Sequence, residues 1–156
     1  MTHPTERLNN NIEIPQLGLG VYRSPPGKET RQTVTWALEL GYRHIDTATA
    51  YGNEASVGEA VRESAISRSE IFVTTKLWNA DHGYDNALRA IDASLDRLGL
   101  DYVDLWLIHW PVEKLRGDAW RAFERVYNER RVRAIGVSNY MAVSYTHLTL
   151  PTNREV

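Results

Sequence analysis

Cysteine is absent from the 156 residues of this sequence. Its absence excludes disulfide bonds, thiolate metal sites and a thiol nucleophile. The histidines His3, His44 and His82 fit no metal-ligand spacing, so we expect no metal site. Any catalytic acid or base must therefore be a carboxylate, a lysine, a tyrosine or a histidine acting without a metal.

Long apolar runs are also missing. No stretch approaches the roughly 20 apolar residues of a transmembrane helix, and the polar segment Met1–Arg7 leads into no apolar run that would indicate a secretory signal. The net charge is only −2, with acids and bases interspersed, so there is no basic stripe for nucleic acid. We expect a globular cytoplasmic protein that binds neither membrane nor nucleic acid.

What the sequence does contain is a regular alternation of strand-like and helix-like segments. Before these segments, the asparagines between Leu8 and Ile12 join two short apolar runs, which predicts an N-terminal β-hairpin. Apolar periodicity and turn residues then predict strands over 16–20, 42–46, 71–76, 103–109 and 133–137, with helices over about 28–40, 53–64, 84–98 and 118–126. Asn53 and Asp118 are the expected N-caps of two of these helices, and Trp36, Trp106 and Trp120 are expected in the core.

Strict alternation with short loops predicts a parallel sheet with right-handed crossovers. An open dinucleotide-binding sheet would carry Gly-x-Gly-x-x-Gly after its first strand, but Gly18 and Gly20 are followed by Val21, Tyr22 and Arg23. We therefore expect an α/β fold of the (β/α)8 TIM-barrel type. It is truncated here to about five β-strands, with four crossover helices and the N-terminal β-hairpin.

Polar side chains stand at the carboxyl ends of successive predicted strands: Asp46, Lys76, His109 and Ser138. In a barrel this end is the catalytic face. Tyr51 follows in the loop after the second strand, within the segment Gly41–Glu54. The sequence thus predicts that a carboxylate, an ammonium, an imidazole and a phenol meet at one rim.

This group suits acid catalysis by Tyr51. An ammonium about 4 Å away favours a phenolate by roughly 4 kcal/mol, or about three pKa units, at an effective dielectric near 20. We therefore expect Lys76 to lower the pKa of Tyr51 toward about 7, and Asp46 to keep Lys76 charged and in place. His109 is expected to hold a carbonyl oxygen by a hydrogen bond while Tyr51 protonates it.

Taken singly, each of these residues also fits a structural role. Asp46 would bond loop amides, Tyr51 would pack half-buried, and Lys76 would be solvated at a strand end. His109 beside Trp110 would be a hydrogen-bonded core histidine. Ser138 and Asn139 also fit a helix cap. The functional interpretation depends on the convergence of several strand ends.

Four segments carry a family resemblance: Gly41–Glu54, Thr74–Trp78, Asp104–Pro111 and Gly136–Asn139. Together, in this order, they resemble the aldo-keto reductase family, and within it the bacterial branch similar to 2,5-diketo-D-gluconate reductases. The resemblance covers roughly residues 7 to 142. It implies an oxidoreductase that reduces aldehydes or ketones to alcohols with NADPH, acts as a monomer and binds a small-molecule carbonyl substrate.

The resemblance also assigns roles to individual residues. It implies a catalytic tetrad of Asp46, Tyr51, Lys76 and His109, with Tyr51 as the proton donor. It further implies cofactor contacts by Gly20, Val21, Asp46, Ser138 and Asn139, and a substrate pocket formed by Tyr22, Trp78, His109 and Trp110. Val21 departs from the family, in which many members have threonine near the cofactor.

The end of the chain does not continue this pattern. Residues 143–156 lack helical periodicity and differ from the family, so we expect residues 1–142 to be the N-terminal part of the barrel and 143–156 to be a non-native, adaptor-like tail. A divergent natural tail is the alternative. A five-stranded piece leaves two sheet edges unpaired, so we expect this chain to aggregate readily and to have little reductase activity.

Two other functions fit the same fold. One is a non-enzymatic, partner-binding barrel subunit similar to the potassium-channel β-subunits. The other is a barrel lyase in which Lys76 forms a Schiff base. The complete tetrad favours the reductase over the first, and pairing of Lys76 with Asp46 disfavours the second, because a Schiff-base lysine must lose its proton.

Overall fold

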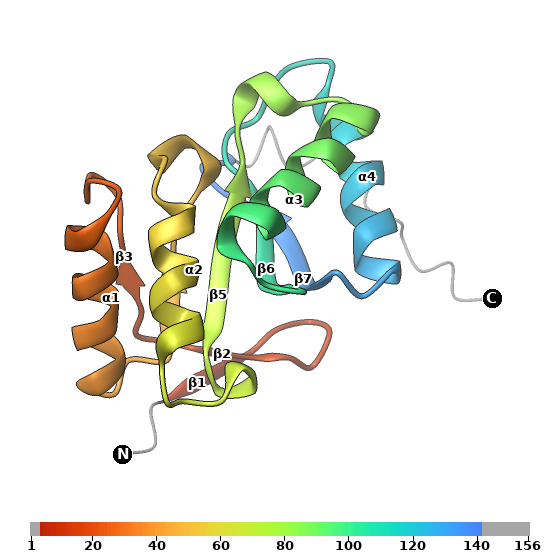
Figure 1. Cartoon of the computed structure of the whole chain (residues 1–156). Helices are drawn as coiled ribbons and strands as arrows, with labels where there is room; N and C mark the ends of the chain where they lie inside the picture. The colour runs from red at the N-terminus through yellow and green to blue at the C-terminus, as the bar shows by residue number, and fades with distance from the viewer. Residues whose placement is uncertain (1–3, 142–156) are drawn as a thin grey trace.

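Figure 1 shows a computed structural model of the chain, in which residues 4–141 are described. Its strands are β1 (Thr5–Arg7), β2 (Glu13–Pro15), β3 (Leu19–Gly20), β4 (His44–Asp46), β5 (Phe72–Leu77), β6 (Val103–Ile108) and β7 (Val132–Val137). Its α-helices are α1 (Lys28–Glu39), α2 (Glu54–Glu63), α3 (Tyr84–Leu98) and α4 (Arg116–Asn128). Three short 3-10 turns, η1 (Thr49–Tyr51), η2 (Arg68–Glu70) and η3 (Asn79–Asp81), were not predicted. The predicted tail, 143–156, lies outside the described residues.

The main sheet has five parallel strands in the sequential order β3-β4-β5-β6-β7. Helices α1 to α4 stand side by side along it, each packed against the next (Figure 1). A sequential order with one layer of helices is the arrangement of a (β/α) barrel. A doubly wound sheet would reverse its order and carry helices on both faces.

Alternation along the strands gives the sheet two different faces. On the helix side, Trp106 is buried and stacks on Phe123 of α4, with ring centroids 3.6 Å apart and planes 7° apart. On the other side, the register places Asp46 of β4 opposite Thr74 of β5, and Lys76 opposite Leu107 of β6. The polar side chains predicted for the site therefore occupy the face that the helices do not cover.

The ends of the sheet are also different. The β1–β2 hairpin crosses the lower end in Figure 1, where Asn10 Nδ2 donates to the carbonyl oxygen of Arg133 at 2.9 Å. The fully buried Asp104 accepts from Arg68 at 2.8 Å and from Arg133 at 2.6 Å at the same end. A buried carboxylate needs this compensation by cations. The hairpin and the ion pairs therefore leave the opposite, carboxyl end of the strands for the site.

Helix α3 shows how closely a sequence pattern can predict an element. The predicted range, 84–98, is confirmed, and the buried Ile91, Leu95 and Leu98 recur at helical spacing. Gly99 ends the helix in the left-handed conformation, with φ of 62°, and donates to the carbonyl oxygen of Leu95. This is the glycine stop expected for a helix followed by a strand.

Two local predictions are wrong, and a third is confirmed in position only. Asn53 is the N-cap residue of α2, but its side chain makes no capping hydrogen bond, because it bonds to Thr47 in its own loop and to the turn after β3. Asp118 lies inside the first turn of α4, which begins at Arg116. Trp36 on α1 is 57% exposed and is not part of the core.

Gly58 marks the closest approach of two helices. A Cβ at this position of α2 would lie 1.9 Å from the carbonyl oxygen of Leu98, at the end of α3. Glycine inside a helix costs about 1 kcal/mol relative to alanine, so its presence here reflects the space between the helices.

We predict that Gly58→Ala destabilises the chain by about 2 kcal/mol, because overpacking outweighs the better helix propensity of alanine. Gly117→Ala in α4 is the control, since a Cβ there meets no atom within 4 Å, and it should be neutral or stabilise by up to about 1 kcal/mol. Urea unfolding of both variants, in a complete barrel that carries residues 16–141, measures the difference. Equal effects of the two substitutions would contradict the close approach.

Candidate active site

The predicted site residues lie at the carboxyl ends of adjacent strands. Asp46 is the last residue of β4, Lys76 the penultimate residue of β5, and His109 follows β6 directly. Backbone hydrogen bonds connect these ends, since His109 N donates to Leu77 O at 3.1 Å and Ser138 N donates to Ile108 O at 2.8 Å. The strand register therefore fixes the relative heights of the side chains.

Lys76 is the cation of this group, and only 6% of its surface is exposed. Its Nζ donates to Asp46 Oδ1 at 2.5 Å and to the carbonyl oxygen of Thr47 at 2.9 Å. A buried ammonium without such partners would be strongly destabilising. The predicted pairing of Lys76 with Asp46 is confirmed.

Tyr51 ends the one-turn helix η1 and faces both other groups. Its ring centroid lies 5.2 Å from Lys76 Nζ and 5.6 Å from the His109 ring. Gly52 follows in the left-handed conformation, with φ of 69°, which ends the turn. The loop after β4 thus brings the phenol to the two strand-end side chains, as the sequence predicts.

The predicted shift of the Tyr51 pKa is wrong in direction. Burial, then the negative charge of Asp46 and then Tyr22, raise the pKa of Tyr51 above its ordinary value. Lys76 does not reverse this shift, because it lies over the ring and its charge is engaged by Asp46 at 2.5 Å. Tyr51 is therefore fully protonated at neutral pH, which is the form required of a proton donor.

His109 is neutral at the same pH. Burial first, and then the positive charge of Lys76, lower its pKa below the ordinary value of 6.5. Its Nδ1 is buried without a hydrogen-bond partner among residues 4–141, so Nε2 is the nitrogen that a ligand can reach. A neutral imidazole with its hydrogen on Nε2 can donate to an oxygen without giving up a proton.

Aromatic side chains surround these polar groups. The ring centroid of Trp78 lies 5.4 Å from that of His109, and the ring of Trp110 lies 6.4 Å from it. Tyr22 lies on the other side of the group, with its ring centroid 5.1 Å from that of Tyr51. All three are partly exposed, so they form an aromatic wall that remains accessible to a ligand.

The predicted cofactor residues lie at the same end of the sheet. Asn139 is left-handed, with φ of 60°, and its Nδ2 donates to His109 O at 2.9 Å and to Ser138 Oγ at 3.0 Å. The Asn139 Oδ1 and the Ser138 hydroxyl hydrogen are left to bind a carboxamide, the polar group of a nicotinamide. A Cβ added at Gly20 would meet no atom within 4 Å, so there is open space next to this residue. The Val21 side chain, in contrast, packs in the core. The residues present therefore fit a nicotinamide cofactor.

Two buried residues at the start of α2 were not predicted as part of the site. Asn53, with 0% exposure, accepts from the Thr47 hydroxyl at 2.7 Å and donates to Val21 O at 2.9 Å. Glu54, with 1% exposure, accepts from the Thr75 hydroxyl at 2.6 Å and from Arg97 Nε at 2.7 Å. Both polar residues close the segment Gly41–Glu54, but apart from Thr47 their partners lie in other loops and elements.

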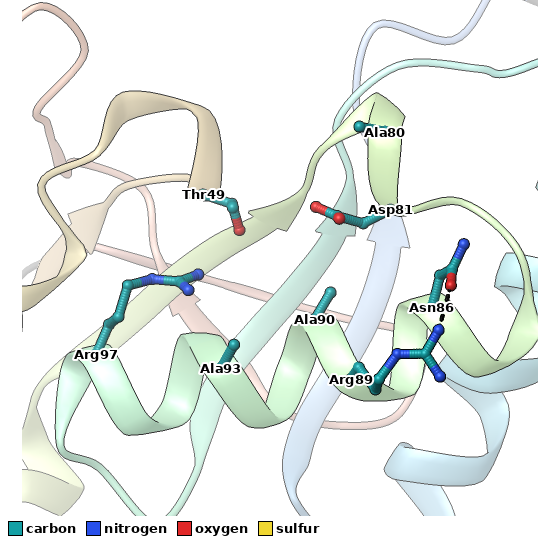
Figure 2. Close-up of a pocket in the computed structure, with 8 residues that line it drawn as sticks. All are labelled: Thr49, Ala80, Asp81, Asn86, Arg89, Ala90, Ala93 and Arg97. Carbon is teal, nitrogen blue, oxygen red and sulfur yellow. Dashed lines mark hydrogen bonds between the residues drawn. The ribbon is translucent and has the colours of Figure 1, made fainter.

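A hollow of about 350 Å³ lies behind the Tyr51 turn (Figure 2). Its lining comes from η1, η3 and α3: Thr49, Ala80, Asp81, Asn86, Arg89, Ala90, Ala93 and Arg97. None of the predicted site residues lines it, so the chemistry belongs to the strand ends and not to this hollow. Within residues 4–141 no group of three potential metal ligands occurs, and no helix there is long and apolar enough to span a membrane.

We predict that the His109 ring titrates below pH 6.5 and that Lys76→Met moves its midpoint upward, because one of the two causes of the lowered pKa is removed. Burial still lowers the His109 pKa in the variant, whereas the Asp46 charge, which raises it, is no longer paired. Histidine ring signals followed by NMR from pH 8 to 5, in a complete barrel that carries residues 16–141, measure both values. His82 is the internal control, since burial lowers its pKa without a contribution from Lys76; an unchanged His109 midpoint would contradict the electrostatic coupling.

Known proteins resemble this chain in sequence and in fold. The "9,11-endoperoxide prostaglandin H2 reductase" of Trypanosoma cruzi (strain CL Brener) is 53% identical over 141 residues, which are 90% of this chain and 50% of that protein. The crystal structure of an aldo/keto reductase from Brucella melitensis superposes with a TM-score of 0.92 at 52% identity, covering 95% of this chain and 57% of that one. A Bombyx mori aldo-keto reductase, solved in complex with NADP, gives a TM-score of 0.88 at 37% identity over 100% of this chain and 56% of that chain.

The chain thus spans about half the length of the relatives that it matches. The predicted fold class, the first five strands of a (β/α)8 barrel preceded by a hairpin, is confirmed. The bacterial branch and the boundary at residue 142 stay predictions. The family profile described as the aldo/keto reductase family matches residues 16–153. This protein belongs to the aldo/keto reductase family of oxidoreductases.

Proposed function

We propose that the complete protein reduces aldehydes or ketones to alcohols with NADPH, as a cytoplasmic monomer of the branch similar to bacterial 2,5-diketo-D-gluconate reductases. The observation that carries this proposal is the convergence of three groups. Tyr51, His109 and Lys76 lie around one point. The Tyr51 ring centroid is 5.2 Å from Lys76 Nζ and 5.6 Å from the His109 ring centroid, and Lys76 is paired with Asp46. That point can hold one carbonyl oxygen.

In this mechanism the neutral His109 donates a hydrogen bond from Nε2 to the carbonyl oxygen and so polarises the carbonyl group. Bound NADPH would supply the hydride that reduces the carbonyl carbon, and would itself be oxidised to NADP⁺. Tyr51 gives its proton to the oxygen, which completes the alcohol. The raised pKa of Tyr51 does not prevent this step, because the alkoxide formed at the oxygen is a far stronger base than a phenolate.

Lys76 acts through charge. Its ammonium lies over the Tyr51 ring at 5.2 Å and stabilises the phenolate that remains after proton transfer. Asp46 holds that ammonium at 2.5 Å and so fixes its position. Water returns a proton to Tyr51 before the next turnover.

We assign the cofactor to Ser138, Asn139, Gly20, Val21 and Asp46, and the substrate to Tyr22, Trp78, His109 and Trp110. The hydrogen-bonding capacity of Asn139 beside His109 supports the first assignment, and the aromatic wall next to His109 supports the second. The carbonyl substrate is a small molecule whose apolar part packs on these rings.

The Schiff-base lyase is disfavoured by the same geometry. A lysine nucleophile must be deprotonated, whereas Lys76 is held between the Asp46 carboxylate and the Thr47 carbonyl oxygen. A partner-binding role without catalysis would not require a buried ion pair next to a tyrosine and a histidine. The reductase explains all four side chains.

We also propose that the 156-residue chain by itself has little reductase activity and aggregates readily. The relatives are about twice as long, and β3 and β7 each have one unpaired edge within residues 4–141. Size-exclusion chromatography and NADPH oxidation on the purified chain test this. Monomeric protein with steady turnover would contradict it.

A complete barrel tests the function. In a chimera, residues 16–141 are joined to the C-terminal half of the Brucella melitensis aldo/keto reductase, which is 52% identical to this chain. We predict NADPH oxidation with aromatic aldehydes, and a loss of kcat on the order of 100-fold or more in Tyr51→Phe.

Tyr42→Phe is the matched control, since it removes a hydroxyl from the partly buried tyrosine just before β4, and it should leave kcat unchanged. Wild-type turnover in Tyr51→Phe would sink the proton-donor assignment. Turnover without NADPH consumption would sink the reductase itself.

A further inference from the structure

We infer that Asn53 is a positioning residue for the proton donor Tyr51, and that it acts on the chemical step of the reaction. This inference rests on the proposed reductase function and adds a residue to it. Its basis is a fully buried amide that joins the two ends of the loop carrying Tyr51.

That loop runs from Thr47 to Asn53, and both of these residues have 0% exposure. The Thr47 hydroxyl donates to Asn53 Oδ1 at 2.7 Å, so a hydrogen bond between side chains closes the loop at its base. Inside the loop, Tyr51 N donates to Ala48 O at 3.0 Å, and Gly52 is left-handed with φ of 69°. The Thr47–Asn53 pair, which we name the loop clasp, therefore restricts where Tyr51 can lie.

Thr47 connects the loop clasp to the charged pair of the site. Its N donates to Thr74 O in β5 at 2.9 Å, and its carbonyl oxygen accepts from Lys76 Nζ at 2.9 Å. The backbone and the hydroxyl of Thr47 are thus bonded on three sides. Any movement of this residue would displace a carbonyl oxygen that helps to compensate the buried ammonium.

The amide nitrogen of Asn53 holds a second segment against this loop. Its Nδ2 donates to Val21 O at 2.9 Å and to Ser24 O at 3.0 Å, which are the two ends of the turn after β3. This turn carries Tyr22, whose ring centroid lies 5.1 Å from that of Tyr51. The same side chain therefore positions Tyr51 through its own loop and through the neighbouring ring.

This bonding pattern requires an amide at position 53. Backbone carbonyl oxygens only accept hydrogen bonds, so both donors come from the NH2 group, and the Thr47 hydroxyl is bonded by the amide oxygen. An alanine would leave three buried polar groups without this partner, which is costly for each of them. Because Asn53 and Thr47 are fully buried, these bonds are internal to residues 4–141.

Proton transfer depends strongly on the position of Tyr51. Its hydroxyl must come within about 2.6–3.2 Å of the carbonyl oxygen, and a displacement of about 1 Å can slow a reaction on the order of 100-fold. Trp78, Trp110 and Asn139 follow other strands, so a loosened loop leaves them in place. Loss of the loop clasp should therefore slow the chemical step more than it weakens binding.

The test measures the chemical step in the complete-barrel chimera. Single-turnover oxidation of NADPH with a saturating aromatic aldehyde excludes product release, which limits kcat in many enzymes. Thr47→Val removes one bond of the loop clasp and keeps a β-branched side chain, and we expect it to lower the single-turnover rate about tenfold. The solvent deuterium isotope effect on this rate should rise, because proton transfer becomes the slower event. KM for NADPH and for the aldehyde should change less than about twofold.

Thr47→Ser restores the hydroxyl and should return the rate to within about twofold of the parent. Asn53→Ala removes all three bonds and should slow the rate further; Thr47→Val keeps the test decisive where Asn53→Ala does not fold. Ser56→Ala is the control for loss of a buried hydroxyl, since Ser56 on α2 accepts from Gly27 N at 2.7 Å outside this loop. It should leave the single-turnover rate and its isotope effect unchanged.

Hydrogen exchange gives a readout that needs no turnover. In Thr47→Val the amides of Tyr51 and Gly52 should exchange at least about tenfold faster than in the parent, while those of β6 stay unchanged. An unchanged single-turnover rate, unchanged exchange, or an equal loss of rate in Ser56→Ala would overturn the proposal. Absence of turnover in the parent chimera would instead contradict the proposed function, and the exchange rates would still decide whether the loop clasp holds Tyr51.

Discussion

The arrangement of the site depends on one buried charge. Lys76 has 6% of its surface exposed, and an ammonium at that depth must be compensated. Asp46 and the carbonyl oxygen of Thr47 supply the compensation from the end of the neighbouring strand. This requirement fixes the relation of β4 to β5 at their carboxyl ends. It also fixes the start of the loop that carries Tyr51, because Asp46 and Thr47 are the residues from which that loop departs.

A second set of buried polar groups extends this arrangement to the surrounding loops. Asn53 joins the turn after β3 to the loop after β4, and Glu54 joins α2 to β5 and α3 through Thr75 and Arg97. Both residues are buried, so each unmade hydrogen bond would leave an uncompensated polar atom in the core. The loops at this end are therefore held by specific bonds to the scaffold, which is what a preorganised site requires.

The electrostatic consequences agree with proton donation to an oxygen. Burial keeps His109 neutral and Tyr51 protonated, so one group can donate a hydrogen bond and the other can give up a proton. Lys76 does not prepare a phenolate in advance, since its charge is engaged by Asp46. In the proposed mechanism its effect falls on the state after proton transfer, when Tyr51 would carry a negative charge. An ammonium that lowered the pKa of the resting tyrosine to 7 would leave much of it in the wrong protonation state.

Much of this protein follows from its sequence alone. The alternation of strands and helices, the glycine stop at Gly99 and the placement of Asp46, Lys76 and His109 at strand ends are all local patterns, because each depends on residues within one or two turns of the chain. These patterns were sufficient for the barrel-type sheet and for the pairing of Lys76 with Asp46. They did not predict that Trp36 is exposed or that α4 begins at Arg116.

Tertiary structure decided what depends on distances between remote segments. Asn53 occupies the predicted N-cap position of α2, yet its side chain bonds to residues 21, 24 and 47 and joins loops instead of capping the helix. The pKa of Tyr51 was expected to fall, yet burial and the nearby Asp46 raise it. The sequence determined which chemical groups reach the end of the sheet, and folding determined their charge states and partners, because burial and Coulomb energy depend on positions in space.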